Sequence, residues 1–403
     1  MSPASSVPGA TAPASAIGAQ RVLWVDYAKG WSILLVVSMH SALGVGLALD
    51  RVGWLHPVVA FAKPFRMPDF FLVAGLFLGG AINWPLRAFL DRKVVHFIYF
   101  FVLWTFIILL TKSGELGLID PRAFLTAFLW AIIDPYSSLW FVQLLPLLFV
   151  VARLTRRLPP VAVILSASAL HVLAARFPEG GQYAMGSDMT GWMTVDTFSL
   201  FSVYFVIGHT ARATIFAFAA WVARRPFAAL AGLAAWAVAH QSAVAAGLTE
   251  IPGLTLVFGL LGGLAVVAAA SLMASAGIAL WFAYCGRKSL PIYLSFAIPM
   301  AVARILLVRT QIVSDPGSMA AIVTAAAILG PLALEALVRG TWASFLFERP
   351  AWAHLSAGRR GHLEPAVAAG VGLDALKSEE KPGVAPSEGA DSKSTIDSIK
   401  SAP

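Results

Sequence analysis

The sequence is poor in charge and nearly devoid of cysteine, and both shortages narrow what the protein can be. Only 12% of the 403 residues are charged, where a soluble globular domain carries about 25%. This shortage excludes a water-soluble fold. The single cysteine, Cys285, excludes an intramolecular disulfide framework and any metal site built on several thiolates.

Several catalytic and binding motifs are also missing. The eight histidines are scattered, with no His-x-x-x-His or Glu-x-x-His pair, so no metal site is expected. The sequence has no Gly-x-Ser-x-Gly elbow and no phosphate-binding glycine loop. Its net charge of +8 does not indicate nucleic-acid binding, because basic residues in so hydrophobic a chain usually mark cytoplasmic loops.

Long apolar runs are what the sequence has in abundance, with 59% hydrophobic residues. A helix needs about 20 mostly apolar residues to cross a bilayer. The runs lack the alternation of outer-membrane strands, so we expect an all-α, polytopic integral membrane protein with about ten transmembrane helices. The expected spans are Trp24–Leu49, Leu55–Ala81, Val94–Thr111, Ser138–Leu154, Pro159–Arg176, Thr197–Phe218, Phe227–Gly247, Leu254–Ile278, Leu290–Val308 and Ser318–Val338.

The distribution of charge predicts the topology. Loops on the side of the N-terminus would hold most of the arginines and lysines, and the opposite loops most of the acidic residues. By the positive-inside rule we expect both termini to be cytoplasmic and the protein to lie in a bacterial inner membrane. The short apolar stretch Arg122–Ile133 is expected to be interfacial or re-entrant.

Composition divides the chain into three parts. Residues 1–20 are rich in Ala, Ser, Pro and Gly and are expected to form a disordered leader. Residues 21–356 would form the transmembrane domain. Residues 357–403 are polar and are expected to form a disordered cytoplasmic tail.

The first span carries an unusual polar stripe. Lys29 and His40 are eleven residues apart, which is about three helical turns plus roughly 20°, so they share one face about 16 Å apart along the axis. Asp26 lies one turn before Lys29 on the same side. Lys29 could simply reach the headgroups or pair with Asp26, and His40 could simply bond a neighbouring helix. A buried ammonium and a buried imidazole on the same helical face are also suited to take part in catalysis.

The second apolar segment is charged and contains prolines. Lys63, Arg66 and Asp69 fall on successive turns of one helical side, and Pro64 and Pro68 should distort the helix. Either Arg66 and Asp69 neutralise each other, or they form a wall that binds an anion or hydroxyl group. The other intramembrane polar residues are each expected to be structural unless they join such a site: His171, His209, His240, Arg304 and Glu335.

Several ordered motifs resemble the membrane acyltransferase 3 family over most of the chain between Arg21 and Pro350. Lys29 and His40 match its Arg/Lys-x10-His signature in the first span. Four later segments are similar to family motifs: Arg66–Gly75, Phe89–Lys93, Ser138–Phe141 and Gly286–Leu294, followed by the closing Phe347–Pro350. Two positions depart from the pattern: Phe296 stands where many members have a histidine, and Asp69 where an apolar residue is usual.

The resemblance implies a stand-alone O-acyltransferase with no bound cofactor. Its donor substrate would be acyl-CoA, with acetyl-CoA as the default. Its acceptor would be a hydroxyl of a cell-envelope carbohydrate or a lipid-linked glycan. The implied catalytic residues are His40 as general base, Lys29 toward the donor and Arg66 toward the developing oxyanion. The residues expected to bind substrate are Asp26, Asp69, Arg92, Trp140, Tyr293 and Glu335.

Three alternatives stay open on the residues alone. Ser41, next to His40, could hold the acyl group covalently. The embedded charges could line the path of a transporter or flippase. The chain could also be a catalytically silent partner subunit.

Overall fold

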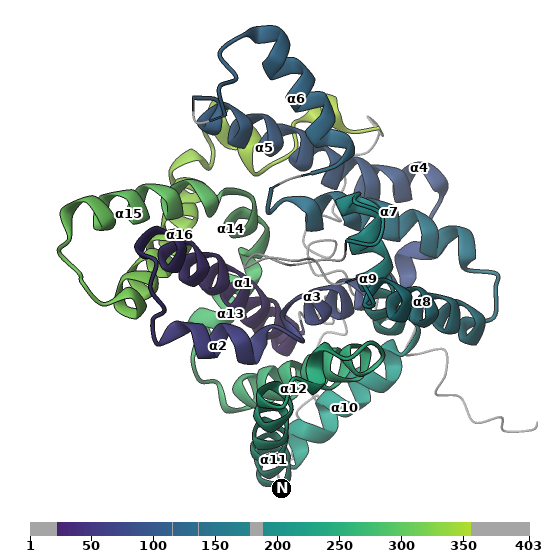
Figure 1. The fold of residues 1–403 in the computed structure, drawn as a ribbon. Helices are drawn as coiled ribbons and strands as arrows, with labels where there is room; N and C mark the ends of the chain where they lie inside the picture. The colour runs from purple at the N-terminus through teal and green to yellow at the C-terminus, as the bar shows by residue number, and fades with distance from the viewer. Residues whose placement is uncertain (1–21, 115, 136, 178–187, 356–403) are drawn as a thin grey trace, which may run out of the picture.

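The computed structural model describes residues 22–114, 116–135, 137–177 and 188–355, and these residues form helices and no strand (Figure 1). The predicted leader, residues 1–20, and the predicted tail, residues 357–403, lie outside the described residues. The helical class expected from the apolar runs is therefore confirmed.

The helices follow one another with short connections. The first half contains α1 (Leu23–Leu49), α2 (Leu55–Ala62), α3 (Arg66–Leu76), η1 (Gly80–Asn83), α4 (Leu86–Phe89), the π-helix η2 (Leu90–Val95), α5 (His96–Lys112), α6 (Pro121–Ile133), α7 (Trp140–Thr155) and α8 (Pro160–Ala174). The second half contains α9 (Met193–Thr210), α10 (Arg212–Arg224), α11 (Pro226–Ala245), η3 (Leu248–Glu250), α12 (Leu254–Ala276), α13 (Leu280–Arg287), α14 (Ser289–Ser295), α15 (Ala297–Thr310), α16 (Pro316–Val338), η4 (Trp342–Leu346) and η5 (Ala351–Ala353).

Helix α1 lies at the centre of the bundle and packs against α3, α12, α13 and α16 (Figure 1). Glycines permit the closest crossings. A Cβ on Gly30 of α1 would lie 2.1 Å from the Phe282 carbonyl oxygen, and one on Gly286 of α13 would lie 1.7 Å from the Asp26 carbonyl oxygen. Small residues let membrane helices approach in this way. The crossing fixes α1, and with it the Lys29–His40 stripe, against α13.

Five helices, within the described residues, are long and apolar enough to cross a membrane: α1, the α4–α5 run Leu86–Lys112, α11, α12 and α16. Two bent pairs raise this number to seven if each is one span. The predicted span Thr197–Phe218 belongs to one of them, because α9 and α10 are bent by 74°. The predicted span Leu290–Val308 belongs to the other, because α14 and α15 are bent by 54°.

The second predicted span, Leu55–Ala81, is also interrupted. Helix α2 ends at Ala62 and α3 begins at Arg66, so the break falls at residues 63–65, next to Pro64. Proline removes a backbone donor and its ring clashes with the preceding turn. The distortion predicted from the prolines is confirmed, and it starts a new helix at Arg66.

After α16 the chain folds back as a strap over η2 and α5. The Tyr99 hydroxyl donates to the Phe345 carbonyl oxygen at 3.0 Å, and Trp104 Nε1 donates to the Leu346 carbonyl oxygen at 2.9 Å. Arg349, which is 5% exposed, forms an ion pair of 3.0 Å with Asp91 of η2. The segment resembling the closing Glu-Arg-Pro motif is therefore built into the fold.

Candidate active site

His40 lies in the second half of α1, with its ring partly buried. The Phe296 ring packs against it, with 5.3 Å between ring centroids. Neither ring nitrogen is hydrogen-bonded to another residue in the part of the chain that the structure describes. The imidazole is thus held by packing and keeps both nitrogens available for a substrate.

Arg66 brings a positive charge toward His40 from the break between α2 and α3. Its side chain is 5% exposed, and its charge, together with that of Lys112, acts electrostatically on the imidazole. Nη1 contacts the Val59 carbonyl oxygen at a long 3.5 Å, and Nε has no hydrogen-bond partner in the part of the chain that the structure describes. A buried guanidinium with spare donors is suited to bind an anionic oxygen.

Asp69 does not neutralise Arg66. Its carboxylate is fully buried on α3, and Oδ1 bonds with the Ser32 hydroxyl of α1. Among the described residues no ion pair joins Asp69 to Arg66, so the internally neutralised pair that the spacing allowed is not formed. Asp69 instead connects α3 to α1 through Ser32 and does not compensate the charge of Arg66.

Two further polar residues lie close to His40 along α1. The Ser41 hydroxyl is buried, 1% exposed, and has no hydrogen-bond partner within the described ranges. One turn beyond His40, the Arg304 guanidinium of α15 lies against Gly44, where a Cβ would be 2.7 Å from Nη1. Gly44 therefore makes room for a second arginine on the His40 side of α1.

The broken helix α14–α15 supplies the apolar wall of this site. Phe296, the residue at the 54° bend, contacts His40, and Tyr293 lies one turn before it with 6.2 Å between the two ring centroids. The Tyr293 hydroxyl donates to the Ser138 carbonyl oxygen at the start of α7. The phenyl ring of Phe296 thus faces His40 at the position where the motif that this segment resembles often has a histidine.

The other end of the stripe lies in basic surroundings. The Lys29 ammonium sits over the Phe77 ring at 4.1 Å from its centroid, and Lys93 donates to the Phe77 carbonyl oxygen at 3.2 Å. The two lysines also interact electrostatically. Arg92 is exposed and stacks over the Trp84 ring at 5.4 Å. Lys29 and Arg92, both predicted to meet the donor, therefore lie near the loop between α3 and α4.

The remaining predicted substrate-binding residues lie in the packed interior. Trp140 is 2% exposed and stacks on Phe201 with 5.5 Å between ring centroids. Asp26 is 4% exposed at the crossing of α1 and α13. Glu335 of α16 is bound by Lys288 at 2.9 Å and by Arg339 at 2.6 Å. Both oppositely charged neighbours of Glu335 come from the protein itself, which favours a structural role.

The structure adds two residues to the site predicted from the sequence. Phe296 was recognised only as a departure from a motif, although its separation of three residues from Tyr293 places both on one helical side. Arg304 is one of the further embedded candidates in the sequence, each expected to be structural unless it joins such a site. A signal existed in Gly44, four residues after His40, because a missing side chain on the same helical face leaves room for a large neighbour.

The geometry joins an imidazole with available nitrogens, a buried arginine and an apolar wall. Comparison with curated proteins and with solved structures gives no match. A family model described as "Acyltransferase domain" matches residues 22–336, which include both ends of the α1 stripe and the wall at Phe296. The chain therefore belongs to the acyltransferase 3 family and is a membrane acyltransferase.

Proposed function

We propose that the protein is an O-acyltransferase that moves an acyl group, acetyl by default, from acyl-CoA to a hydroxyl of a cell-envelope carbohydrate or lipid-linked glycan. The observation that carries the proposal is the His40 imidazole, which has no hydrogen bond within the described residues and lies within the field of Arg66. Such a ring can accept a proton from a hydroxyl group.

In the proposed reaction His40 takes the proton of the acceptor hydroxyl while the hydroxyl oxygen attacks the thioester carbonyl carbon. A new C–O bond forms and the C–S bond breaks. The proton on His40 then passes to the departing thiolate, so an alcohol and a thioester become an ester and a thiol. Arg66 stabilises the oxyanion that develops on the carbonyl oxygen, because its Nε has no hydrogen-bond partner among the described residues.

Lys29 and Arg92 are the proposed contacts for the donor. The phosphates of acyl-CoA are anionic, and the loop between α3 and α4 brings Lys29 and Lys93 together around Phe77. With His40 about 16 Å further along α1, an extended donor could keep its phosphates near Lys29 and reach His40 with its thioester. Asp69 is the proposed positioning residue, since it holds α3 to α1 through Ser32.

For the membrane arrangement we propose ten spans over residues 21–356 with both termini cytoplasmic, in a bacterial inner membrane. The five to seven candidate spans support this arrangement, and the shorter apolar helices α7 and α8 and the interrupted segment α2–α3 would be the remaining spans, with α6 interfacial or re-entrant. The lysines at the Phe77 end of α1 would then face the cytoplasm, where acyl-CoA is available.

The test uses the purified full-length chain in detergent and in liposomes. With acetyl-CoA and envelope glycan fragments, we expect thiol release together with a mass increase of the glycan by one acyl group. Solute movement across the liposome membrane without covalent change would instead identify a carrier. Mass spectrometry of envelope glycans from cells with and without the gene would then identify the acceptor.

A further inference from the structure

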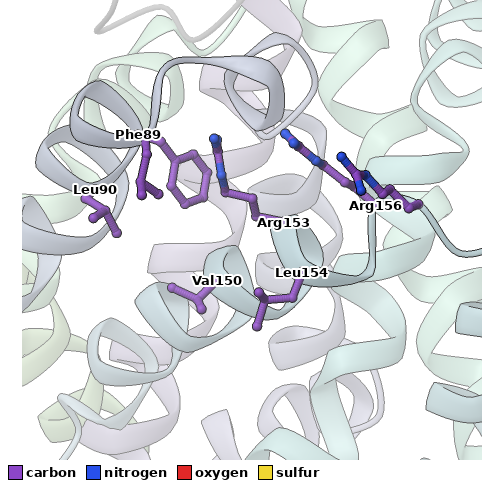
Figure 2. A pocket seen from close by; sticks show the side chains of 8 residues that line it. Phe89, Leu90, Val150, Arg153, Leu154 and Arg156 are labelled. Carbon is purple, nitrogen blue, oxygen red and sulfur yellow. The ribbon is translucent and has the colours of Figure 1, made fainter.

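A small pocket lies away from the His40 site, between α4, the start of η2 and the end of α7 (Figure 2). Its volume is about 330 Å³. Its lining combines three arginines, Arg153, Arg156 and Arg157, with apolar side chains that include Leu86, Leu90 and Leu154. The proposed donor contacts, Lys29 and Arg92, do not line it.

The pocket is divided into a charged part and an apolar part. Figure 2 shows the guanidinium ends of Arg153 and Arg156 on one side and the side chains of Val150 and Leu154 on the other. A ligand that fits both parts carries a negative group joined to an apolar portion.

Backbone contacts hold two of the arginines in place. Arg153 donates to the carbonyl oxygens of Ile82 and Trp84, both at 2.9 Å, and stacks over the Phe89 ring at 4.6 Å. Arg156 donates to the Ile82 carbonyl oxygen at 3.0 Å. Guanidinium groups fixed in this way lose little freedom when they bind a phosphate.

The described part of the chain provides no counter-charge for the pocket. Within the described ranges no carboxylate forms an ion pair with Arg153, Arg156 or Arg157. The nearest acidic residue in sequence to the pocket's η2 side, Asp91, is already bound by Arg349 and His354. An anion is the missing counter-charge.

The apolar side of the pocket opens outward. Leu154 is 75% exposed and Leu86 is 58% exposed. In a membrane protein such leucines contact lipid chains, and basic pockets between helices at the membrane surface bind anionic headgroups. We infer that this pocket binds the phosphate of an anionic phospholipid, with the first methylenes of an acyl chain along Leu86 and Leu154. This inference does not depend on the proposed reaction.

The test measures lipid binding by the full-length protein by native mass spectrometry, with phosphatidylglycerol and phosphatidylcholine as probes. We expect phosphatidylglycerol to stay bound to the wild type and phosphatidylcholine to be lost. The double variant R156Q/R157Q should weaken phosphatidylglycerol binding by about tenfold or more, the scale of one lost charge-assisted hydrogen bond, and leave phosphatidylcholine unchanged. Arg153 is kept because it binds two carbonyl groups of the loop.

Two further variants keep the test decisive. R224Q/R225Q removes an exposed arginine pair at the end of α10, outside the pocket, and should leave binding unchanged. Leu154→Glu keeps all three arginines and adds a negative charge at an exposed position, so it should weaken phosphatidylglycerol binding without unfolding the protein. Equal losses in R156Q/R157Q and R224Q/R225Q, full binding by Leu154→Glu, or displacement of phosphatidylglycerol by coenzyme A would each overturn the inference.

Discussion

Two groups of charged residues in this molecule differ in how completely the protein satisfies them. In the strap, Asp91 receives Arg349 at 3.0 Å, the Leu355 amide at 2.8 Å and His354 at 3.5 Å. Around His40, by contrast, buried polar atoms lack hydrogen-bond partners in the described chain, namely Arg66 Nε, Ser41 Oγ and Asp69 Oδ2.

This difference distinguishes charged groups that stabilise the fold from charged groups that remain available to bind a ligand. A buried polar group without a partner costs free energy, so such groups are expected where a bound molecule completes the hydrogen bonds. In the strap, the Asp91 carboxylate has its partners within the protein and holds η2 in place, although the buried Arg349 Nε also lacks a hydrogen-bond partner in the described chain. The His40 group leaves this cost unmet, which is why we assign the acceptor and the thioester to that place.

The largest expected effect comes from removing His40. His40→Ala should reduce acyl transfer by about 10²- to 10⁴-fold, because no other described residue is placed to take the hydroxyl proton. The measurement is the initial rate of acyl transfer at matched amounts of membrane protein. The amount of folded protein should stay near the wild-type level, since within the described residues the ring packs against Phe296 and makes no hydrogen bond.

Ser41→Ala is the matched control beside it. Ser41 is buried and its hydroxyl has no partner in the described chain, so a methyl group fits the same space. We expect near-normal transfer. If Ser41→Ala is inactive and His40→Ala retains turnover, the acyl group passes through Ser41 and the general-base assignment is wrong.

The second effect is on stability and belongs to the strap. Arg349→Ala leaves the Asp91 carboxylate, 4% exposed, without its closest cation. Breaking a buried ion pair from one side costs about 3–5 kcal/mol. We expect a clear fall of the unfolding temperature in detergent, and Arg309→Ala, an exposed arginine at the end of α15, should leave it unchanged. If the Arg349→Ala protein is as stable as the wild type, the Arg349–Asp91 ion pair does not stabilise the fold, and the assignment of a structural role to the strap is wrong.

The third effect returns to catalysis. Arg66→Ala should lower the turnover number by about 10²-fold, the scale of one lost oxyanion donor, with a smaller change in the Michaelis constant for acyl-CoA. Arg66→Lys should recover only part of the rate, because a single ammonium cannot reproduce a guanidinium. If Arg66→Ala instead raises the Michaelis constant alone, Arg66 binds the donor and not the developing charge.

The sequence predicted the helical class, the position of the stripe on one helix and the break near Pro64. Each depends on a local property: run length, a spacing of eleven residues, or a proline. It did not predict Ser32 as the partner of Asp69 or Lys288 as a partner of Glu335, because those contacts depend on which helices cross. Ser32 lies 37 residues before Asp69 and Lys288 lies 47 before Glu335, and no local pattern joins them.

The number of spans shows the same limit. Hydropathy indicates that a segment is apolar, but it does not tell a straight span from a bent pair. The bend of α14–α15 lies at Phe296, which packs against His40 from the neighbouring helix. The position of Arg304 beside Gly44 likewise depends on how α15 packs against α1, which hydropathy does not indicate.

The smallest expected effect tests a residue that the sequence assigned to substrate and the structure binds to the protein. Glu335→Gln keeps an oxygen that can accept from Lys288 and Arg339 and removes only the charge, so we expect a loss of stability of about 1 kcal/mol or less and an unchanged rate of acyl transfer. Glu250→Gln, at the exposed Lys63 ion pair, is the control and should change neither. If Glu335→Gln lowers turnover at normal stability, pairing within the protein does not show that a charged residue is structural. The distinction between the two groups of charged residues would then depend on His40 alone.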